Sequence, residues 1–170
     1  LDGTLLNGKK PYKIASLGLS RTFQNIRLFK DMTVLENVLV GMANQNKPYL
    51  LSSFLRLPKF YQSEDALRQK AMELLAIFDL DGDAETLAKN LPYGQQRRLE
   101  IVRALATQPK ILFLDEPAAG MNPQETAELT QLIRKIKEEF NITIMLIEHD
   151  MSLVMEVTER IYVLEYGRLI

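Results

Sequence analysis

The chain has 170 residues, which is enough for one globular domain with a hydrophobic core and too short for two ordinary domains. Its 21 basic and 22 acidic residues nearly balance and form no basic block, so the composition does not favour nucleic acid as a partner. The absence of cysteine excludes disulfide bonds and thiolate metal sites, and no apolar run approaches the ~20 residues of a membrane-spanning helix. With no signal-peptide pattern at its start, the chain is expected in a reducing compartment such as the cytosol.

The N-terminal part predicts short elements joined by polar turns. Residues 11–17 favour a brief helix, and residues 19–23 favour a short strand that runs into a polar loop. Thr33 and Glu36 match a capping box, in which each side chain satisfies an amide left free at a helix start. Apolar residues at helical spacing then extend this predicted helix to Met42.

The next segment predicts helices without strands. Residues 44–59 are too apolar for a linker and too broken for a long helix, so we expect an ordered, variable excursion there. Ser63 is the expected cap of a second helix, whose apolar stripe reaches Phe78 and which ends at residues 81–82. Residues 31–90 are therefore expected to form a helical subdomain beside a sheet.

The second half of the chain alternates helices with strands. The expected helices are residues 95–107, a helix from Pro123 to Asn141, and residues 153–157, and the expected strands are residues 111–114, 142–147 and 161–164. This alternation is what a parallel sheet with crossover helices requires. We therefore predict a single α/β domain over residues 1–170, with residues 91–170 as its signature helix and catalytic part.

Two adjacent carboxylates, Asp115 and Glu116, follow the apolar run ILFL and precede Pro117. Open α/β sheets place ligand sites at the carboxyl ends of their strands. Because consecutive strand residues point to opposite faces, one acid can hold a hard cation such as Mg²⁺ while the other faces a water molecule to be activated. The alternative is that Asp115 and Glu116 are two solvated acids at a strand end, and their spacing alone supports it. The apolar run ILFL before them and Pro117 after them favour a metal and catalytic site.

Five segments stand in an order that resembles the ATP-binding cassette (ABC) ATPases. RTFQ resembles their Q-loop, LPYGQQRRLEIVRALATQP the signature motif with its helix, ILFLDEP the Walker B strand, AAGMNP the D-loop, and IEHDM the switch-histidine region. The resemblance spans Gln24 to His149, nearly the whole chain. It implies a P-loop NTPase-type parallel sheet with crossover helices and an inserted helical subdomain.

The resemblance also implies ATP and Mg²⁺ as cofactors and assigns roles to single residues. Asp115 would contribute to Mg²⁺ binding, and Glu116 would be the base that polarises the attacking water. His149 would contact the γ-phosphate, and Gln24 would reach Mg²⁺ and the water. Phosphoryl transfer needs mainly positioning and charge neutralisation, which these residue types supply. The alternatives are a hydrogen-bonded structural histidine and a surface-loop amide, and the motif order favours the catalytic roles.

The signature segment departs from the usual LSGGQ, since Pro92 and Tyr93 replace the serine and one glycine. Gly94 precedes a predicted helix start at Gln95, where backbone amides form an anion site. In the family this surface binds the γ-phosphate of the nucleotide held by the opposite subunit, so the resemblance makes Gly94 and Gln95 nucleotide-binding residues. A glycine that merely permits a turn is the alternative. Asn122 stands where the D-loop commonly has aspartate, and it can still hydrogen-bond across a dimer.

YGQQRRLEI with DEPAAGMNP resembles the ATPase subunits of importers for branched-chain amino acids. That likeness implies an energy-coupling subunit bound peripherally at the cytoplasmic face of the inner (plasma) membrane. Its implied partners are a second ABC ATPase subunit and transmembrane permease subunits, and nucleic acid is not among them. The alternatives are a soluble ABC ATPase without a membrane partner and a non-catalytic interaction fragment.

No GxxxxGK[ST] phosphate loop occurs in the 170 residues. The chain also begins at a turn signal without a methionine, and it stops where a strand resumes after Gly167. We expect the domain to be truncated at both ends, with the phosphate loop upstream of Leu1. The 170-residue chain alone is then expected to bind ATP poorly and to hydrolyse hardly any of it.

Overall fold

The computed structural model describes residues 1–43 and 58–170. A three-stranded parallel sheet lies at its centre, with strand order β1-β2-β3. The strands are β1 (Leu19–Arg21), β2 (Ile111–Asp115) and β3 (Thr143–Ile147). The α-helices are α1 (Pro11–Ser16), α2 (Val34–Met42), α4 (Pro58–Ile77), α5 (Tyr93–Leu105), α6 (Pro123–Phe140) and α7 (Met151–Val157), and two short 3₁₀ helices are η2 (Asp81–Asp83) and η3 (Ala88–Asn90).

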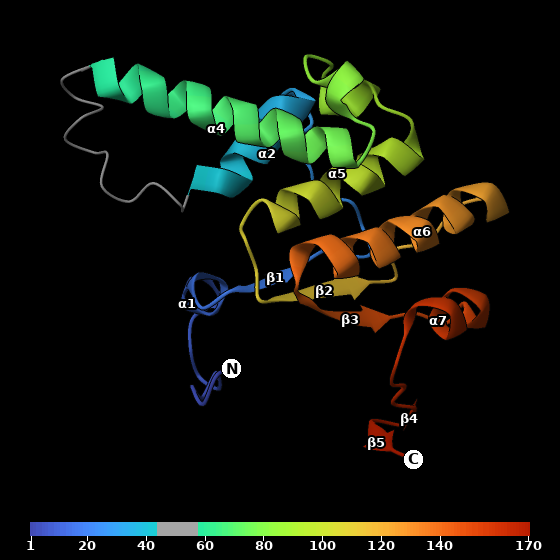
Figure 1. Ribbon diagram of the computed structural model, residues 1–170. Coiled ribbons are helices and arrows are strands. Elements are labelled where there is room, and N and C mark those ends of the chain that lie inside the picture. Colours follow the sequence, from blue (N-terminus) through green and yellow to red (C-terminus); the bar gives the residue numbers. More distant parts are fainter. Residues whose placement is uncertain (44–57) are drawn as a thin grey trace.

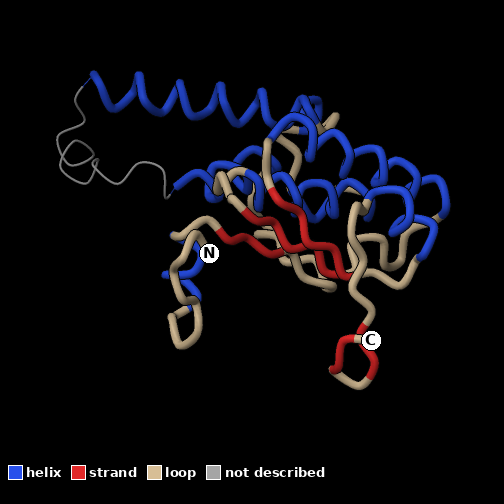
Figure 2. Tube along the Cα trace, turned by 60° about the horizontal axis from the view of Figure 1, so that its bottom comes forward, coloured by secondary structure: helices blue, strands red, loops and turns tan. Residues whose placement is uncertain are grey.

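Helices cover one side of the sheet in layers (Figures 1 and 2). In Figure 1, α6 lies next to the strands, α5 lies above it, and α4 is farthest from the sheet. Alternate residues of β2 follow this asymmetry, since Leu112 and Leu114 are fully buried whereas Ile111 and Phe113 are partly exposed. In β3, Met145 and Ile147 remain about half exposed, and among the described residues β2 is its only neighbour in the sheet. The sheet thus has one covered face and one open face.

Two helices begin at capping boxes and confirm the starts expected from the sequence. In α2, Thr33 Oγ1 accepts from Glu36 N at 3.1 Å and Glu36 Oε2 accepts from Thr33 N at 2.8 Å. In α6, Asn122 and Glu125 form the same reciprocal pair, and Pro123 occupies the first helical position. This helix ends at Asn141, whose φ of 46° lies in the left-handed region common at helix C-termini.

The helices α2, α4 and α5 share one hydrophobic core, which includes Val38, Leu75 and Val102. The α2 and α5 backbones approach closely at Gly41, where an added Cβ would lie 2.6 Å from the Arg103 carbonyl oxygen. Only glycine fits this crossing without displacing one of the helices. The bounds of the expected helical subdomain, residues 31–90, stay a prediction.

Two expected helix starts differ from the structure. Ser63 is not a helix cap, because α4 already begins at Pro58, a residue whose missing amide suits a helix start. The helix α5 begins at Tyr93, two residues earlier than expected. Most of the expected excursion at residues 44–59 lies outside the described residues.

The expected strand at residues 161–164 is wrong. Residues 161–163 are not in a strand, and a small antiparallel hairpin of β4 (Leu164–Glu165) and β5 (Arg168–Leu169) turns at Tyr166 and Gly167, both with positive φ. The apolar character of residues 161–164 predicts a buried strand, but all four residues are exposed. Among the described residues, no strand of the parallel sheet pairs with them. In the part of the chain that the structure describes, no helix combines the length and the hydropathy of a membrane span.

Candidate functional site

The loop after β1 meets the carboxyl end of β2. The two strands pair in parallel up to Arg21 and Phe113, and Thr22 N then donates to the Phe113 carbonyl at 2.9 Å. Two residues further on, Gln24 Nε2 donates a hydrogen bond of 2.7 Å to Glu116 Oε2. The structure therefore brings together the side chains of two residues that the sequence singled out.

The backbone of Glu116 is held in an unusual conformation. Its φ is 43°, in the left-handed region, which costs a residue with a Cβ about 1–2 kcal/mol. Its amide donates to the Ile147 carbonyl at 2.9 Å, and its own carbonyl accepts from Arg97 Nη2 at 2.8 Å. Such strained residues cluster at functional sites, where the surrounding structure fixes them.

Asp115 points to a different partner from its neighbour. Its Oδ2 accepts from Arg21 Nη2 at 2.5 Å, and its side chain is only 20% exposed. The sequence reasoning did not foresee this ion pair, although Arg21 belongs to the RTFQ segment. A cation bound at Asp115 would meet a carboxylate whose charge Arg21 already partly neutralises.

His149 follows β3, and β3 ends beside β2 because Ile147 pairs with Asp115. Its backbone amide donates to Glu148 Oε2 at 3.1 Å. Its side chain is exposed, and within residues 1–43 and 58–170 its imidazole makes no hydrogen bond. The backbone thus brings His149 to the expected edge of the sheet, and within the described residues its imidazole has no hydrogen bond to Glu116.

Glu148 joins this region to the D-loop, which was not foreseen. Its Oε1 accepts from the Ala118 amide at 2.9 Å, while its Oε2 accepts from the His149 amide. One carboxylate therefore fixes the loops that follow β2 and β3 relative to each other. Its place in the IEHD segment, directly before His149, was the available signal.

Gly94 and Gln95 lie in the first turn of α5 and line a pocket of about 240 Å³ against the start of α6. An added Cβ at Gly94 would lie 3.0 Å from Glu125 Oε1, so the two helix starts are in close contact there. Gln95 Nε2 donates to Asp83 Oδ2 at 3.3 Å. Asn122, at the edge of α6, uses its Oδ1 to cap the helix through the Glu125 amide at 2.9 Å.

Tyr93 connects the same two segments. Its hydroxyl donates to the Ala119 carbonyl at 2.8 Å, and its ring lies against Gly120, where an added Cβ would be 3.4 Å from the hydroxyl oxygen. Gly120 has a φ of 79°, which favours glycine for a second reason. The residue that replaces a glycine of the usual signature therefore holds the D-loop of its own chain.

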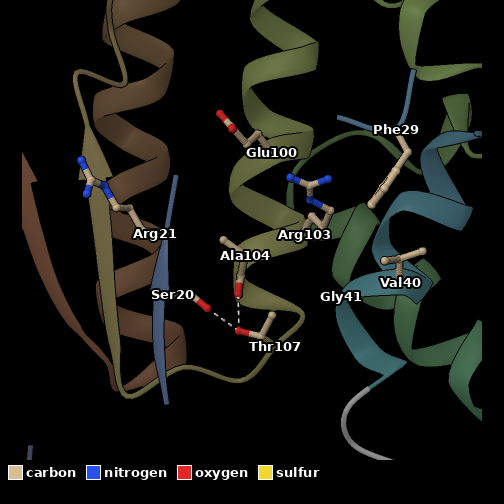
Figure 3. Close-up of a pocket in the computed structure, with 9 residues that line it drawn as sticks. All are labelled: Ser20, Arg21, Phe29, Val40, Gly41, Glu100, Arg103, Ala104 and Thr107. Atoms are coloured by element: carbon tan, nitrogen blue, oxygen red, sulfur yellow. Dashed lines mark hydrogen bonds between the residues drawn. The ribbon is translucent and has the colours of Figure 1, made fainter. Parts of the chain in front are cut away.

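A second pocket, of about 310 Å³, lies between β1, α2 and α5 (Figure 3). At one end the Ser20 and Thr107 hydroxyls are 2.6 Å apart, and at the other the Arg103 guanidinium lies 5.3 Å from the centre of the Phe29 ring. Burial lowers the pKa of Arg103, and the charge of Glu100 opposes this shift. Val40 is also exposed beside the pocket.

Within the described ranges, no cluster of three or more histidine and carboxylate side chains is arranged to hold a metal ion. The oxygen donors at the end of β2 are nevertheless of the type that Mg²⁺ prefers. That ion usually keeps several waters and takes one or two protein carboxylates together with phosphate oxygens. Asp115 and Gln24 fit such a partial donor set.

The model of the family described as ABC transporter matches residues 1–119. This chain belongs to the ABC transporter family. The chain is 49% identical over 162 residues to the high-affinity branched-chain amino acid transport ATP-binding protein LivG of Escherichia coli strain K12. This match covers 95% of the chain and 64% of LivG. It is 47% identical over 167 residues to BraF of Pseudomonas aeruginosa, a protein of the same description, with 98% of the chain and 66% of BraF covered.

Solved ABC structures confirm the fold class. The ADP conformation of the ATP-binding cassette MJ1267 matches with a TM-score of 0.79 at 30% identity, covering 100% of this chain and 66% of that one. A nucleotide-free ATP-binding cassette from an ABC transporter matches with a TM-score of 0.77 at 31% identity, covering 100% of this chain and 66% of that one. The predicted ABC-type α/β sheet and the resemblance to branched-chain importer ATPases are thus both confirmed, and the chain spans slightly less than two thirds of LivG and BraF.

Proposed function

We propose that this chain provides ATP-binding and ATP-hydrolysing residues of the energy-coupling subunit of a branched-chain amino acid importer. The observation that carries the proposal is the 2.7 Å hydrogen bond from Gln24 to the Glu116 carboxylate. It brings together Gln24, to which the family resemblance gives contact with Mg²⁺ and the water, and Glu116, to which it gives activation of that water. Similarity to LivG and BraF supports the substrate class.

In this proposal Glu116 takes a proton from the water that attacks the γ-phosphate of ATP. Gln24 orients the carboxylate through its amide nitrogen, so its amide oxygen is the group that reaches Mg²⁺. Asp115 contributes the second oxygen donor, generally through water, and His149 contacts the γ-phosphate from the end of β3. When bound, Mg²⁺ neutralises charge on the phosphates.

The second part of the proposal is a site shared between two ABC subunits. Gly94 and Gln95, in the first turn of α5, serve the nucleotide held by the other subunit through backbone amides at a helix start. Pro92 has no amide, which leaves this role to the residues after it. Asn122 faces the same partner with its amide nitrogen, since its oxygen caps α6.

The pocket between α2 and α5 is the proposed seat for a helix of a transmembrane permease subunit. Phe29 and Val40 are 46% and 41% exposed beside it, so apolar surface is available to an incoming helix. This contact would hold the subunit peripherally at the cytoplasmic face of the membrane. The 170 residues contain no phosphate-loop motif, and we propose that they hydrolyse almost no ATP without one.

Glu116→Gln in the full-length gene product tests the catalytic assignment. We expect retained ATP binding and a loss of steady-state hydrolysis of about 100-fold or more, because an amide cannot accept the proton. Glu138→Gln, at an exposed position of α6, is the matched control and should hydrolyse ATP at the wild-type rate. Unchanged hydrolysis in the Glu116 variant would remove this residue from the mechanism.

Reconstitution with its permease subunits in lipid vesicles tests the substrate class. ATP-dependent uptake of leucine or isoleucine, abolished by Glu116→Gln, is the expected result. Other relatives are ATP-binding proteins for methionine and for sulfate or thiosulfate import, so both solutes are included as competitors. Hydrolysis without uptake of branched-chain amino acids would contradict the importer assignment while leaving the ATPase intact.

A further inference from the structure

We propose that Arg97 is a positioning residue that ties the backbones of Gln24 and Glu116 to α5. The proposal rests on the ATPase function proposed above. It concerns a side chain that does not touch the reacting atoms and acts through the two residues that do.

All five N–H donors of the Arg97 guanidinium are used, and the side chain is fully buried. Four of its hydrogen bonds go to backbone carbonyls beside the proposed catalytic residues. The acceptors are Phe23 (2.6 Å), Gln24 (3.1 Å), Glu116 (2.8 Å) and Pro117 (3.0 Å). One side chain therefore joins the loop after β1 to the loop after β2.

Glu100 completes this connection one turn further along α5. Its Oε2 accepts from Arg97 Nη1 at 2.8 Å, and its Oε1 accepts from the Arg27 amide at 3.1 Å. Glu100 is only 2% exposed, so the pair is shielded from water on both sides. The helix thus holds the segment from Phe23 to Arg27 at both of its ends.

Burial makes these hydrogen bonds obligatory. A buried guanidinium without partners would be an uncompensated charge in the interior, so the Arg97 side chain stays buried only while its acceptors stay in place. The contact to the Glu116 carbonyl also helps to hold the left-handed backbone at that residue. Loss of Arg97 would therefore free the strained backbone of Glu116, which carries the carboxylate, and the loop that carries Gln24.

The arrangement has a consequence for communication within the subunit. The helix that carries Arg97 also carries Gly94 and Gln95 in its first turn. Because the guanidinium is planar and all five of its N–H groups are hydrogen-bonded, we expect a shift of α5 to move the Gln24 and Glu116 backbones with it.

The test is Arg97→Lys in the full-length gene product, with Arg134→Lys as control. Lysine keeps the charge but has one compact ammonium group, so it cannot reach the carbonyls of both loops. We expect kcat for ATP hydrolysis to fall by about 100-fold, as a misplacement of about 1 Å does, with the KM for ATP close to wild type. Arg134, on α6, contacts the Glu156 carboxylate and carbonyl at the surface, and its replacement should leave kcat unchanged.

Amide hydrogen exchange supplies a readout independent of hydrolysis. In Arg97→Lys, exchange should become at least about tenfold faster at the amides of Arg27 and Glu116, which donate to Glu100 and to the Ile147 carbonyl, while α6 keeps its protection. A folded Arg97→Lys protein with wild-type kcat, or with unchanged exchange in both loops, overturns the proposal. Wild-type protein that never hydrolyses ATP refutes the proposed function, and the exchange measurement then still decides whether Arg97 holds the loops.

Glu100→Gln decides the matter if Arg97→Lys does not fold. A glutamine has a single accepting oxygen, so either Arg97 or the Arg27 amide loses its partner, while the carbonyl contacts of Arg97 remain possible. We expect a smaller fall in kcat with the KM for ATP unchanged and with faster exchange at Arg27. Wild-type kcat in this variant, together with misfolded Arg97→Lys, overturns the positioning role and leaves only a contribution to stability.

Discussion

The hydroxyl of Tyr93 donates a 2.8 Å hydrogen bond to the Ala119 carbonyl, and so the signature segment holds the D-loop of its own chain. In the usual signature a glycine stands at this position and offers no such contact. In this chain a hydrogen bond therefore joins the signature segment to the D-loop of the same subunit.

Tyr93→Phe should lower the thermal midpoint by a few degrees, because it removes one hydrogen bond worth about 0.5–1.5 kcal/mol while the ring stays against Gly120. Tyr93 is 43% exposed, so the lower end of this range is expected. Thermal unfolding followed by circular dichroism measures the change. Tyr12→Phe is the control, because the Tyr12 hydroxyl is exposed and has no hydrogen-bond partner in the described part of the chain, and its midpoint should not move.

Gly41→Ala should destabilise the protein by about 1–3 kcal/mol, the usual range for overpacking. The new methyl group would lie 2.6 Å from the Arg103 carbonyl oxygen and 2.9 Å from the Ala106 Cβ, both on the α5 side. Gly82→Ala adds the same group where nothing lies within 4 Å, so it should be neutral or slightly stabilising. Urea unfolding of the two variants gives the comparison, and equal midpoints would show that α2 and α5 do not approach as described.

Asn122→Ala should destabilise the protein by about 1 kcal/mol, because α6 loses its cap at the Glu125 amide. Asn122→Asp keeps the accepting oxygen and places a negative charge at the helix start, so it should be at least as stable as wild type at low salt. Chemical denaturation at two salt concentrations separates the effects. A result in which both variants lose the same stability would show that Asn122 does not act as a cap.

Gln24→Ala should lower kcat for ATP hydrolysis by about 10-fold or more without unfolding the protein, since it removes the 2.7 Å hydrogen bond that orients Glu116. Gln124→Ala, at an exposed position near the start of α6, removes an amide of the same kind and should keep the wild-type rate. The assay uses the full-length gene product with Mg²⁺ and saturating ATP. Equal rates in the two variants would mean that Gln24 does not support Glu116.

Local patterns predicted the elements that local interactions control. The capping box at Thr33 predicted the start of α2 and Pro123 predicted the start of α6, because each signal lies within a few consecutive residues. The apolar run after Lys110 predicted β2 for a similar reason. The apolar run from Ile161 to Leu164 wrongly predicted a buried strand. Strand propensity reflects how side chains fit a pleated surface, and it does not tell whether a neighbouring strand is present to pair with the run.

Only those site residues that lie in sequence motifs could be predicted from the sequence. The order of RTFQ and ILFLDEP anticipated that Gln24 and Glu116 act together, and the structure brings their side chains into contact. Arg97 escaped notice because it is one of two adjacent arginines in a polar stretch, and nothing local indicates which is buried. Its partners are carbonyls 19 to 74 positions away in the sequence, and only the tertiary structure assembles them.

The open side of β3 has a practical consequence for handling the protein. Among the described residues, one edge of β3 has no neighbouring strand, and Met145 and Ile147 on β3 are half exposed, so β3 can pair with a strand from another copy of the chain. The 170-residue chain produced by itself should therefore self-associate as its concentration rises, and Met145→Lys should raise the concentration at which this begins. Light scattering over a dilution series would follow the effect, and purification is best carried out at low protein concentration.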